Sequence, residues 1–365
     1  MRWMMLMLLL TSCAAMAQDK QIVPLRYELW WDERSFWFIG KELTTPGNAK
    51  LPPLNNPKFF SSKFADSERL FAVAEEEGEL ILVADTDGDN DLTDEKVFRL
   101  RQRGYHRVFG PIPMKIRVNG KIVVRHIGVR VDREEDGSLT PYLIVASRWK
   151  GTVQWDGKSV PVTILDANAD GLVNEDDFLF LGDEFEGRRL PVSGRLGIEG
   201  RFFRFHVPPT GEHLVIEPIQ VKSATVQVRG DEASLTLEDN DGRWTLDGRN
   251  GKVSAPAGEF RLLEVTVSRK DSQGRNWVLT AAAYGPAAPR LNVSEHGASL
   301  EIEPLKVELI YNRKGDEVEF SLDIKTANGM SLRGLTVDNR LPPEPKLQLK
   351  APNGEVIAEP QFHYG

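Results

Sequence analysis

The chain has 365 residues, enough for two or three domains that each bury a core. Its 41% hydrophobic and 27% charged residues are ordinary for a globular protein and argue against wholesale disorder. The formal net charge of −8 argues against nucleic acid as a partner. Two short stretches, residues 85–95 and 166–177, carry six and five carboxylates, which together exceed the whole net charge. The acidity is therefore local, and it needs a local cause.

The first 17 residues have the pattern of a secretory signal peptide. One Arg precedes a short apolar run from Met4 to Leu10, and small residues follow. The run is too short to span a bilayer as a permanent helix. Ala15-Met16-Ala17 fits the small-x-small cleavage rule, so we expect an exported protein that is periplasmic or extracellular. The alternative is lipidation at Cys13, because Leu10 to Cys13 also resembles the bacterial lipobox; this would be the only attachment to a membrane.

The cysteine content indicates that disulfides do not stabilise the mature protein. Cys13 is the only cysteine in the chain, so the protein has none after cleavage at Ala17 and must fold without disulfides. A bound metal can stabilise such a fold, because a ligand that binds only the folded state favours it by mass action.

Beyond the N-terminus the sequence predicts a mostly β protein. Apolar and polar residues alternate over five to eight positions between Gly-containing turns, of which Asn119-Gly120 and Asp241-Gly242 are typical of hairpins. We expect an N-terminal β domain over residues 18–205 that contains both acidic stretches. One or two immunoglobulin-like or prealbumin-like β-sandwich modules should follow, over residues 222–287 and 291–365. Pro- and Gly-rich segments mark the boundaries between them.

The second acidic stretch resembles the calcium loop of the EF-hand family in its spacing. It reads ILDANADGLVNEDDF, residues 164–178, with Gly171 at the sixth position of the loop and the apolar Val173 at the eighth. An aspartate stands where a longer glutamate is usual at the twelfth position, so we expect weaker affinity or fewer ligands. The predicted ligands are Asp166, Asn168, Asp170, Leu172 through its carbonyl, Asn174 and Asp177.

The first stretch repeats the same alternation. It reads DTDGDNDLTDE, with no basic residue among its six carboxylates. Asn90 takes the sixth position, because asparagine tolerates a left-handed backbone, and Leu92 takes the eighth. Lys96 falls at the twelfth position and cannot bind a cation, so Glu95 or Asp94 would have to close the site. The predicted ligands are Asp85, Asp87, Asp89, Asp91, Thr93 and Glu95.

The ligand type predicts Ca²⁺. Both stretches offer oxygen and contain neither Cys nor His, which disfavours zinc and copper. Magnesium requires stricter octahedral geometry, and calcium outside the cytoplasm can fill weak sites of order 10⁻⁴ to 10⁻³ M. Each stretch follows an apolar β-like run, so we expect strand–loop sites rather than helix–loop–helix units. The alternative is a pair of surface turns without metal, since Asp, Asn and Gly are common turn residues.

Other catalytic signatures are weak. The six histidines are scattered and form no zinc-binding motif, and no G-x-S-x-G elbow of a serine hydrolase is present. A glycosidase-like pair of carboxylates that are distant in sequence would be invisible in the sequence. The aromatic cluster YELWWDERSFWF, residues 27–38, could stack on sugar rings if exposed, but its alternation favours the edge of a β core.

Five segments carry a family resemblance: residues 35–52, 80–95, 162–181, 254–267 and 351–365. Together they resemble a group of uncharacterised exported bacterial proteins of the kind found in planctomycetes and their relatives. The resemblance implies export, β modules and calcium, and it implies no established activity. The segment PAGEFRL, within residues 254–267, is similar to a strand of prealbumin-like modules.

These observations predict a calcium-stabilised protein with a binding or scaffolding role at the bacterial cell envelope and no catalytic role. Its partner would be an envelope protein or a glycan. The alternative is an envelope hydrolase acting on glycan or peptide, which would need an open cleft lined by carboxylates away from the two acidic stretches. A third hypothesis, an accessory subunit of a larger envelope assembly, predicts a broad exposed apolar patch.

Overall fold

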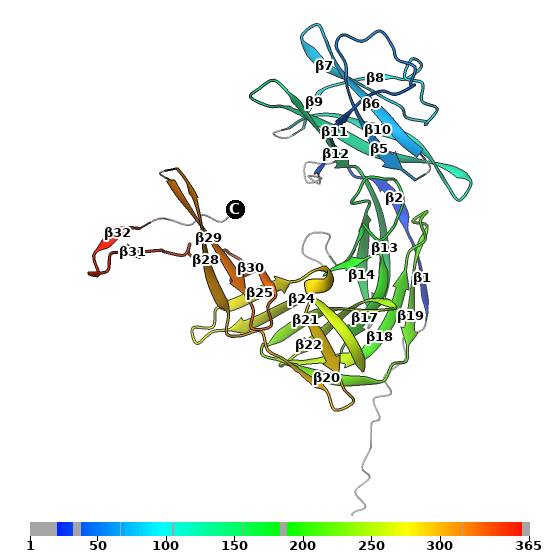
Figure 1. Ribbon diagram of the computed structural model, residues 1–365. Helices are drawn as coiled ribbons and strands as arrows, with labels where there is room; N and C mark the ends of the chain where they lie inside the picture. The colour runs from blue at the N-terminus through cyan, green and yellow to red at the C-terminus, as the bar shows by residue number, and fades with distance from the viewer. Residues whose placement is uncertain are drawn as a thin grey trace, which may run out of the picture.

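The computed structural model describes residues 20–31, 38–65, 67–103, 106–155, 157–182, 188–315 and 317–359 (Figure 1). The signal-peptide prediction and Cys13 fall outside these residues. Strands make up nearly all of the regular structure in the described ranges, with one 3₁₀ turn, η1 (Gly285–Ala287), so the predicted β class is confirmed. In these ranges no helix combines the length and the hydrophobicity needed to cross a membrane.

Two antiparallel five-stranded sheets form the upper part of the molecule in Figure 1. Their facing side chains form one core, to which Phe60 and Phe71 contribute from one sheet and Met114 and Ile127 from the other. The first sheet has the order β4 (Leu43–Thr44), β5 (Lys58–Phe64), β6 (Ser67–Glu76), β7 (Glu79–Ala84), β8 (Val97–Arg99). The second has the order β3 (Phe38–Gly40), β12 (Leu139–Val145), β11 (Lys121–Arg133), β10 (His106–Val118), β9 (Arg101–Arg103).

The Asn119-Gly120 turn shows why the sequence forms these hairpins. Both residues have positive φ, 51° and 80°, and they join β10 to β11 with Val118 opposite Lys121. A two-residue turn with two left-handed residues matches the twist of the strands that it joins. This hairpin prediction is confirmed.

A third antiparallel sheet lies below the first two. It packs against four strands of the large sheet, β1 (Gln21–Pro24), β17 (Ser193–Ile198), β18 (Arg201–His206) and β19 (His213–Ile219). The core between them includes Trp149, Ile164, Phe203 and Leu214. Its order is β16 (Arg188–Pro191), β15 (Phe178–Leu181), β14 (Lys158–Leu165), β13 (Ser147–Trp155), β2 (Arg26–Leu29).

The large sheet has fifteen strands and forms the lower part of Figure 1. Its main path is β1 (Gln21–Pro24), β19 (His213–Ile219), β18 (Arg201–His206), β17 (Ser193–Ile198), β22 (Gly242–Arg249), β21 (Glu232–Asp239), β24 (Gly258–Lys270), β25 (Asn276–Ala282), β30 (Ser331–Val337), β29 (Glu317–Lys325), β28 (Lys306–Lys314). Beside this path lie β20 (Ser223–Val228), β23 (Lys252–Pro256), β26 (Arg290–Val293) and β27 (Ala298–Leu300).

Backbone pairing in this sheet links segments that are distant in sequence. Strand β17 pairs in parallel with β22, and β25 pairs with β30. One buried cluster includes residues from Phe202 to Met330. A separate small hairpin, β31 (Leu349–Lys350) with β32 (Val356–Ala358), follows the large sheet. The division of the chain into domains stays a prediction.

Candidate metal sites

Each acidic stretch connects two neighbouring antiparallel strands. Residues 85–95, here called loop 1, run from the end of β7 to β8, and residues 166–177, loop 2, run from the end of β14 to β15. The first aspartate of each loop follows the last strand residue directly. The expected strand–loop arrangement is therefore present in both cases.

The two loops share one backbone design. The fourth residue of each loop, Gly88 or Ala169, has positive φ, 83° or 54°. The sixth residue, Asn90 or Gly171, also has positive φ, 66° or 81°, as the turn prediction required. Two left-handed residues separated by one position curl the chain tightly, which turns alternate side chains toward a common centre.

The apolar residue at the eighth position anchors each loop as predicted. Leu92 and Val173 are 0% and 2% exposed. Leu92 packs with Phe59 and Leu70, whereas Val173 belongs to the core around Trp149 and Ile164. Burial of these side chains fixes the polar part of each loop against a rigid sheet.

Loop 2 holds two buried carboxylates from its opposite ends. Asp166 and Asp177 are 1% and 0% exposed. The two Oδ atoms of Asp166 accept hydrogen bonds from the backbone N–H groups of Asp170 (3.0 Å) and Gly171 (2.9 Å). Those of Asp177 accept from the N–H groups of Ala167 (2.8 Å) and Asn174 (2.9 Å). Both carboxylates are thus held within the loop.

Burial makes the charges on these two carboxylates costly. Desolvation raises the pKa of Asp177 to about 7. Desolvation and the neighbouring charge of Asp177 raise the pKa of Asp166 well above its usual value. Two adjacent buried carboxylates of this kind need either protons or a cation to remain in the fold.

The other predicted ligands of loop 2 form hydrogen bonds with the carboxylate of Asp170. One of its carboxylate oxygens, Oδ1, accepts the N–H of Leu172 at 2.8 Å. The other accepts the amide nitrogens of Asn168 at 3.1 Å and Asn174 at 2.7 Å. An amide oxygen binds a cation and an amide nitrogen does not, so both asparagines would have to turn their amides over to act as ligands. The donor types, three carboxylates and two amides, suit a hard cation. Among the described residues, however, the three carboxylates that already lie within 4.8 Å of one another are those of loop 1, so the acids of loop 2 would have to move closer together around an ion.

In loop 1 the structure brings together the three carboxylates of the predicted triad. Oxygens of Asp85, Asp87 and Asp89 lie within 4.8 Å of one another, close enough to hold a metal ion. Asp85 is buried and accepts the N–H of Gly88 at 2.6 Å and that of Asn90 at 3.3 Å. Burial raises the pKa of Asp85.

The later residues of loop 1 have other partners. The carboxylate of Asp91 accepts the ammonium of Lys50 at 2.5 Å and the hydroxyl of Thr93 at 2.5 Å, and these contacts lower its pKa to about 2. Position seven needs only a backbone carbonyl, so this does not remove a side-chain ligand. Glu95 accepts the N–H of Thr86 at 2.5 Å. The last carboxylate of loop 1 thus accepts a hydrogen bond from the second residue of the loop, as Asp177 does from Ala167 in loop 2.

The fold brings to loop 1 basic groups that its sequence lacks. The guanidinium of Arg69, 1% exposed, lies against Gly88, where a Cβ atom would stand 0.9 Å from Nη1. The ammonium of Lys115 is 3.6 Å from a carboxylate oxygen of Asp87. Together with Lys50, these side chains offset part of the acidic charge. All three lie far from the loop in sequence, so the local pattern gave no signal of them.

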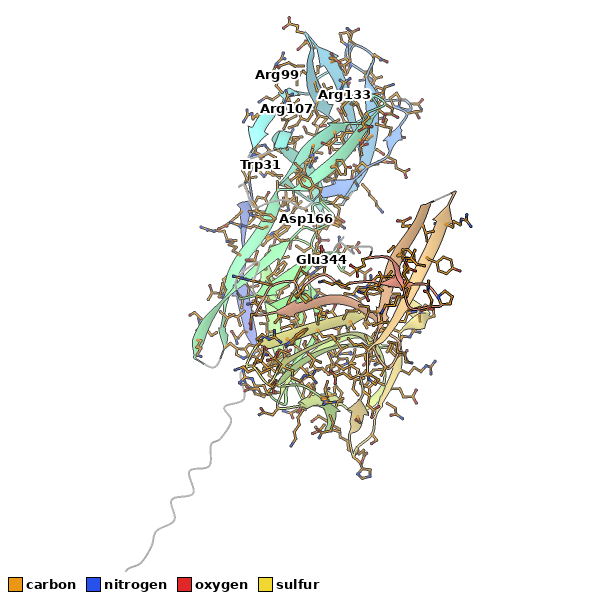
Figure 2. The ribbon with its side chains drawn as sticks, turned by 90° about the vertical axis from the view of Figure 1, so that its left-hand side faces the viewer. Trp31, Arg99, Arg107, Arg133, Asp166 and Glu344 are labelled. Carbon is orange, nitrogen blue, oxygen red and sulfur yellow. The ribbon has the colours of Figure 1, made fainter. Side chains whose placement is uncertain are left out.

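Loop 2 contacts four sheets, and Asp166 lies where the upper sheets meet the rest of the molecule (Figure 2). The carbonyl of Asp170 accepts the N–H of Ala65 (3.0 Å), which follows β5. The N–H of Val173 donates to the carbonyl of Pro209 (3.0 Å), which precedes β19. Loop 2 itself belongs to the third sheet, and β10 and β11 cover it from the second.

Arg125 of β11 is the main contact from that second sheet. Its Nε donates to the carbonyl of Gly171 (3.2 Å) and its Nη2 to the carbonyl of Thr210 (3.0 Å). The guanidinium also lies over the rings of Tyr27 and Trp149, 4.9 and 5.0 Å from their centres. Loop 2 therefore connects several sheets, and the role of Arg125 could not be predicted from the local sequence pattern.

Replacing Gly171 with alanine should destabilise the protein strongly. Its φ of +81° disfavours any side chain, and a Cβ atom would lie 2.4 Å from Cδ1 of Ile116. We expect Gly171→Ala to lower the free energy of unfolding by about 2–4 kcal/mol in chemical denaturation. Gly120→Ala is the matched control, because Gly120 has a φ of +80° and nothing within 4 Å of its Cβ position. Equal losses in the two variants would show that the crowding around loop 2 has no effect.

The aromatic cluster at residues 27–38 is described in part. Trp30 is 2% exposed and belongs to the upper core, and Trp31 packs on Gly128. The hydroxyl of Tyr27 hydrogen-bonds Nδ1 of His126 at 2.8 Å. These three aromatic residues are therefore used in packing, as the core interpretation expected, while residues 32–37 lie outside the described part.

Comparisons of the chain with protein-family models, with curated protein sequences and with solved structures find no match.

Proposed function

We propose that loops 1 and 2 bind calcium and that the protein is a calcium-stabilised binding or scaffolding component of a bacterial cell envelope. The observation that carries the proposal is the convergence of the Asp85, Asp87 and Asp89 carboxylates within 4.8 Å, in a loop whose backbone design recurs in loop 2. All of the donors are oxygen atoms, which favours a hard cation over zinc or copper. The number of oxygens and the irregular loop geometry favour calcium over magnesium.

Calcium would have a structural role. In loop 2 it would neutralise Asp166 and Asp177 at the point where four sheets meet. In loop 1 it would hold the end of β7, whose neighbour Thr86 accepts the N–H of Lys115 from β10 at 2.7 Å. An ion at either site would thus stabilise the contacts between sheets, which suits a scaffold that has no disulfides.

An exposed apolar face supports a role in binding. In the hairpin β28–β29, Val307, Leu309 and Tyr311 are 64%, 40% and 71% exposed. They lie opposite Ile324, Leu322 and Phe320 on one face of the hairpin. Exposed apolar faces of this kind mark contact sites for other macromolecules. This favours a component of an envelope assembly over an isolated enzyme.

Isothermal titration calorimetry of the mature chain, residues 18–365, tests the calcium proposal. We expect two calcium sites with dissociation constants of order 10⁻⁴ to 10⁻³ M or tighter, and weaker binding of magnesium. Asp166→Asn should abolish the site in loop 2 and leave the site in loop 1, and Asp87→Asn should do the reverse. Asp136→Asn, in an exposed hairpin turn, is the control. If both loop variants titrate like the unmodified chain, the proposal is wrong.

A further inference from the structure

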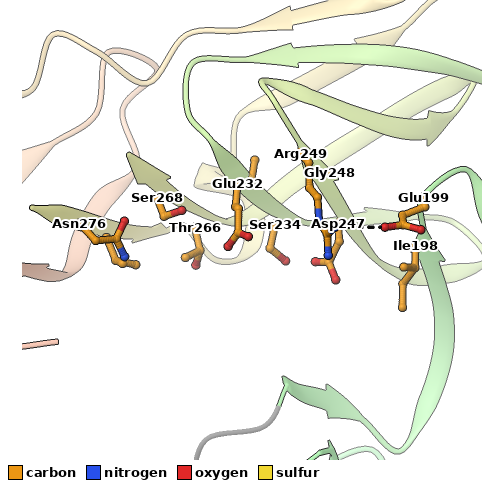
Figure 3. Close-up of a pocket in the computed structure, with 12 residues that line it drawn as sticks. Ile198, Glu199, Glu232, Ser234, Asp247, Gly248, Arg249, Thr266, Ser268 and Asn276 are labelled. Atoms are coloured by element: carbon orange, nitrogen blue, oxygen red, sulfur yellow. Dashed lines mark ion pairs between the residues drawn. The ribbon is translucent and has the colours of Figure 1, made fainter. Parts of the chain in front are cut away.

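A polar groove crosses five strands of the large sheet, away from both acidic loops (Figure 3). It runs from β17 over β22, β21 and β24 to β25, and its volume is about 360 Å³. This size lies within the range of small-molecule binding sites. Two rows of side chains form its floor.

The strand register places the side chains of each row on the same face of the sheet. In one row Asp247 lies opposite Ser234, and Ser234 lies opposite Thr266. In the other row Glu232 lies opposite Ser268. Because these residues are two positions apart along each strand, both rows point to the same side, as Figure 3 shows. Their spacing is set by the backbone and not by a loop.

The opposite face of the same strands is rigid. Leu235, Leu246 and Val265 alternate with the groove residues and are all 0% exposed in the main core of this sheet. Thr266 and Thr280 are further fixed by a contact of 3.1 Å between their hydroxyl oxygens. A ligand would therefore bind to preorganised polar groups, and the entropic cost of ordering these side chains on binding would be small.

The charges of the groove restrict the class of ligand. Glu199, Glu232 and Asp247 bring three negative charges, and Arg249, whose Nη1 is 3.5 Å from Glu199, brings one positive charge. This balance disfavours phosphates, nucleic acids and anionic polysaccharides. Among the described residues, the three carboxylates close enough to share a metal ion are those of loop 1, and the groove acids do not form such a group.

We propose that this groove binds a neutral oligosaccharide. Sugar hydroxyls both donate and accept hydrogen bonds, and the groove offers carboxylate acceptors beside hydroxyl and amide groups that do both. Asp247 and Glu232 accept from hydroxyls, while Ser234, Ser268 and Asn276 serve either function. The side chains of Ile198 and Val278 at the two ends contact the apolar C–H faces of the sugar rings. This inference rests on the binding role proposed above and identifies its ligand as a glycan.

The test uses the calcium-loaded mature chain and four probes. The neutral probes are the tetramer of N-acetylglucosamine and maltotetraose, the cationic probe is tetralysine, and the anionic probe is a heparin tetrasaccharide. Binding is measured by saturation-transfer NMR and by calorimetry. We expect at least one neutral tetrasaccharide to bind, with the heparin fragment failing to compete. Asp247→Asn should weaken binding about tenfold, and Ser234→Tyr, which fills the groove, should abolish it.

Matched variants separate the groove from the rest of the sheet. Thr266→Val should weaken binding, and Thr236→Val should not, because Thr236 lies on the same face of β21 but outside the groove. Three results would each overturn the proposal. Both neutral sugars could fail to bind, tetralysine alone could bind, or the substitutions at Asp247 and Ser234 could leave sugar binding unchanged. Calcium titration of the same sample tests calcium binding by loops 1 and 2 independently of sugar binding, so either proposal can fail alone. Cleavage of a bound tetrasaccharide would uphold the ligand class and replace the non-catalytic role with the hydrolase alternative.

Discussion

Removing calcium from the mature chain with a chelator should lower its thermal unfolding midpoint by about 5–10 °C at neutral to mildly alkaline pH. A site with a dissociation constant of about 10⁻⁴ M contributes about 2.7 kcal/mol to stability in about 10 mM calcium, and the chain has two such candidate loops. The effect should be large because loop 2 contacts four sheets, so its loosening weakens more than one core.

Differential scanning calorimetry with and without chelator checks this expectation. The double variant Asp87→Asn/Asp166→Asn should show no difference between calcium and chelator, because each substitution removes a buried or converging carboxylate from one site. Magnesium at the same concentration should restore only part of the midpoint. A chelator shift that persists in the double variant would locate the calcium effect outside these loops.

The stability of the calcium-free protein should fall as the pH rises from about 4 to about 8. Burial raises the pKa of Asp177 to about 7 and that of Asp166 well above its usual value. The folded protein therefore holds protons on these groups that the unfolded chain has already released. Stability that is present below the unfolded pKa, near 4, is lost as the pH rises through the folded pKa. For Asp177 alone the loss is about 4 kcal/mol.

Chemical denaturation in chelator across this pH range measures the effect. Asp177→Asn should remove much of the slope, because an amide does not ionise at any of these pH values. Asp176→Asn, the exposed neighbour, should keep the full slope. Saturating calcium should also flatten the profile, since the ion replaces the protons. Stability that rises with pH in the calcium-free chain would contradict the burial of two ionisable carboxylates.

The local parts of both sites could be predicted from the sequence. An apolar β-like run predicted a strand before each loop, and the spacing of acidic residues predicted the triad Asp85, Asp87 and Asp89. The turn at the sixth position and the buried anchor at the eighth were also predictable, since both depend on residues within the loop. Such features need only a dozen consecutive residues.

The features that required the fold were invisible in the sequence. Lys50 and Arg69 reach loop 1, and Arg125 reaches loop 2, only because sheet pairing brings distant segments together. The left-handed backbone of Ala169, a residue buried in the upper core, had no signal, because alanine rarely adopts it. The parallel pairing of β17 with β22 also depends on residues about 50 apart.

A crystal structure of the mature chain grown in calcium, with anomalous difference maps, tests the central claim most directly. We expect one strong peak within each loop, surrounded by oxygen atoms at about 2.4 Å, with the amides of Asn168 and Asn174 turned so that their oxygens face the ion. Maps without peaks at either loop, with both amide nitrogens still bonded to Asp170, would contradict the claim that calcium holds these carboxylates in place.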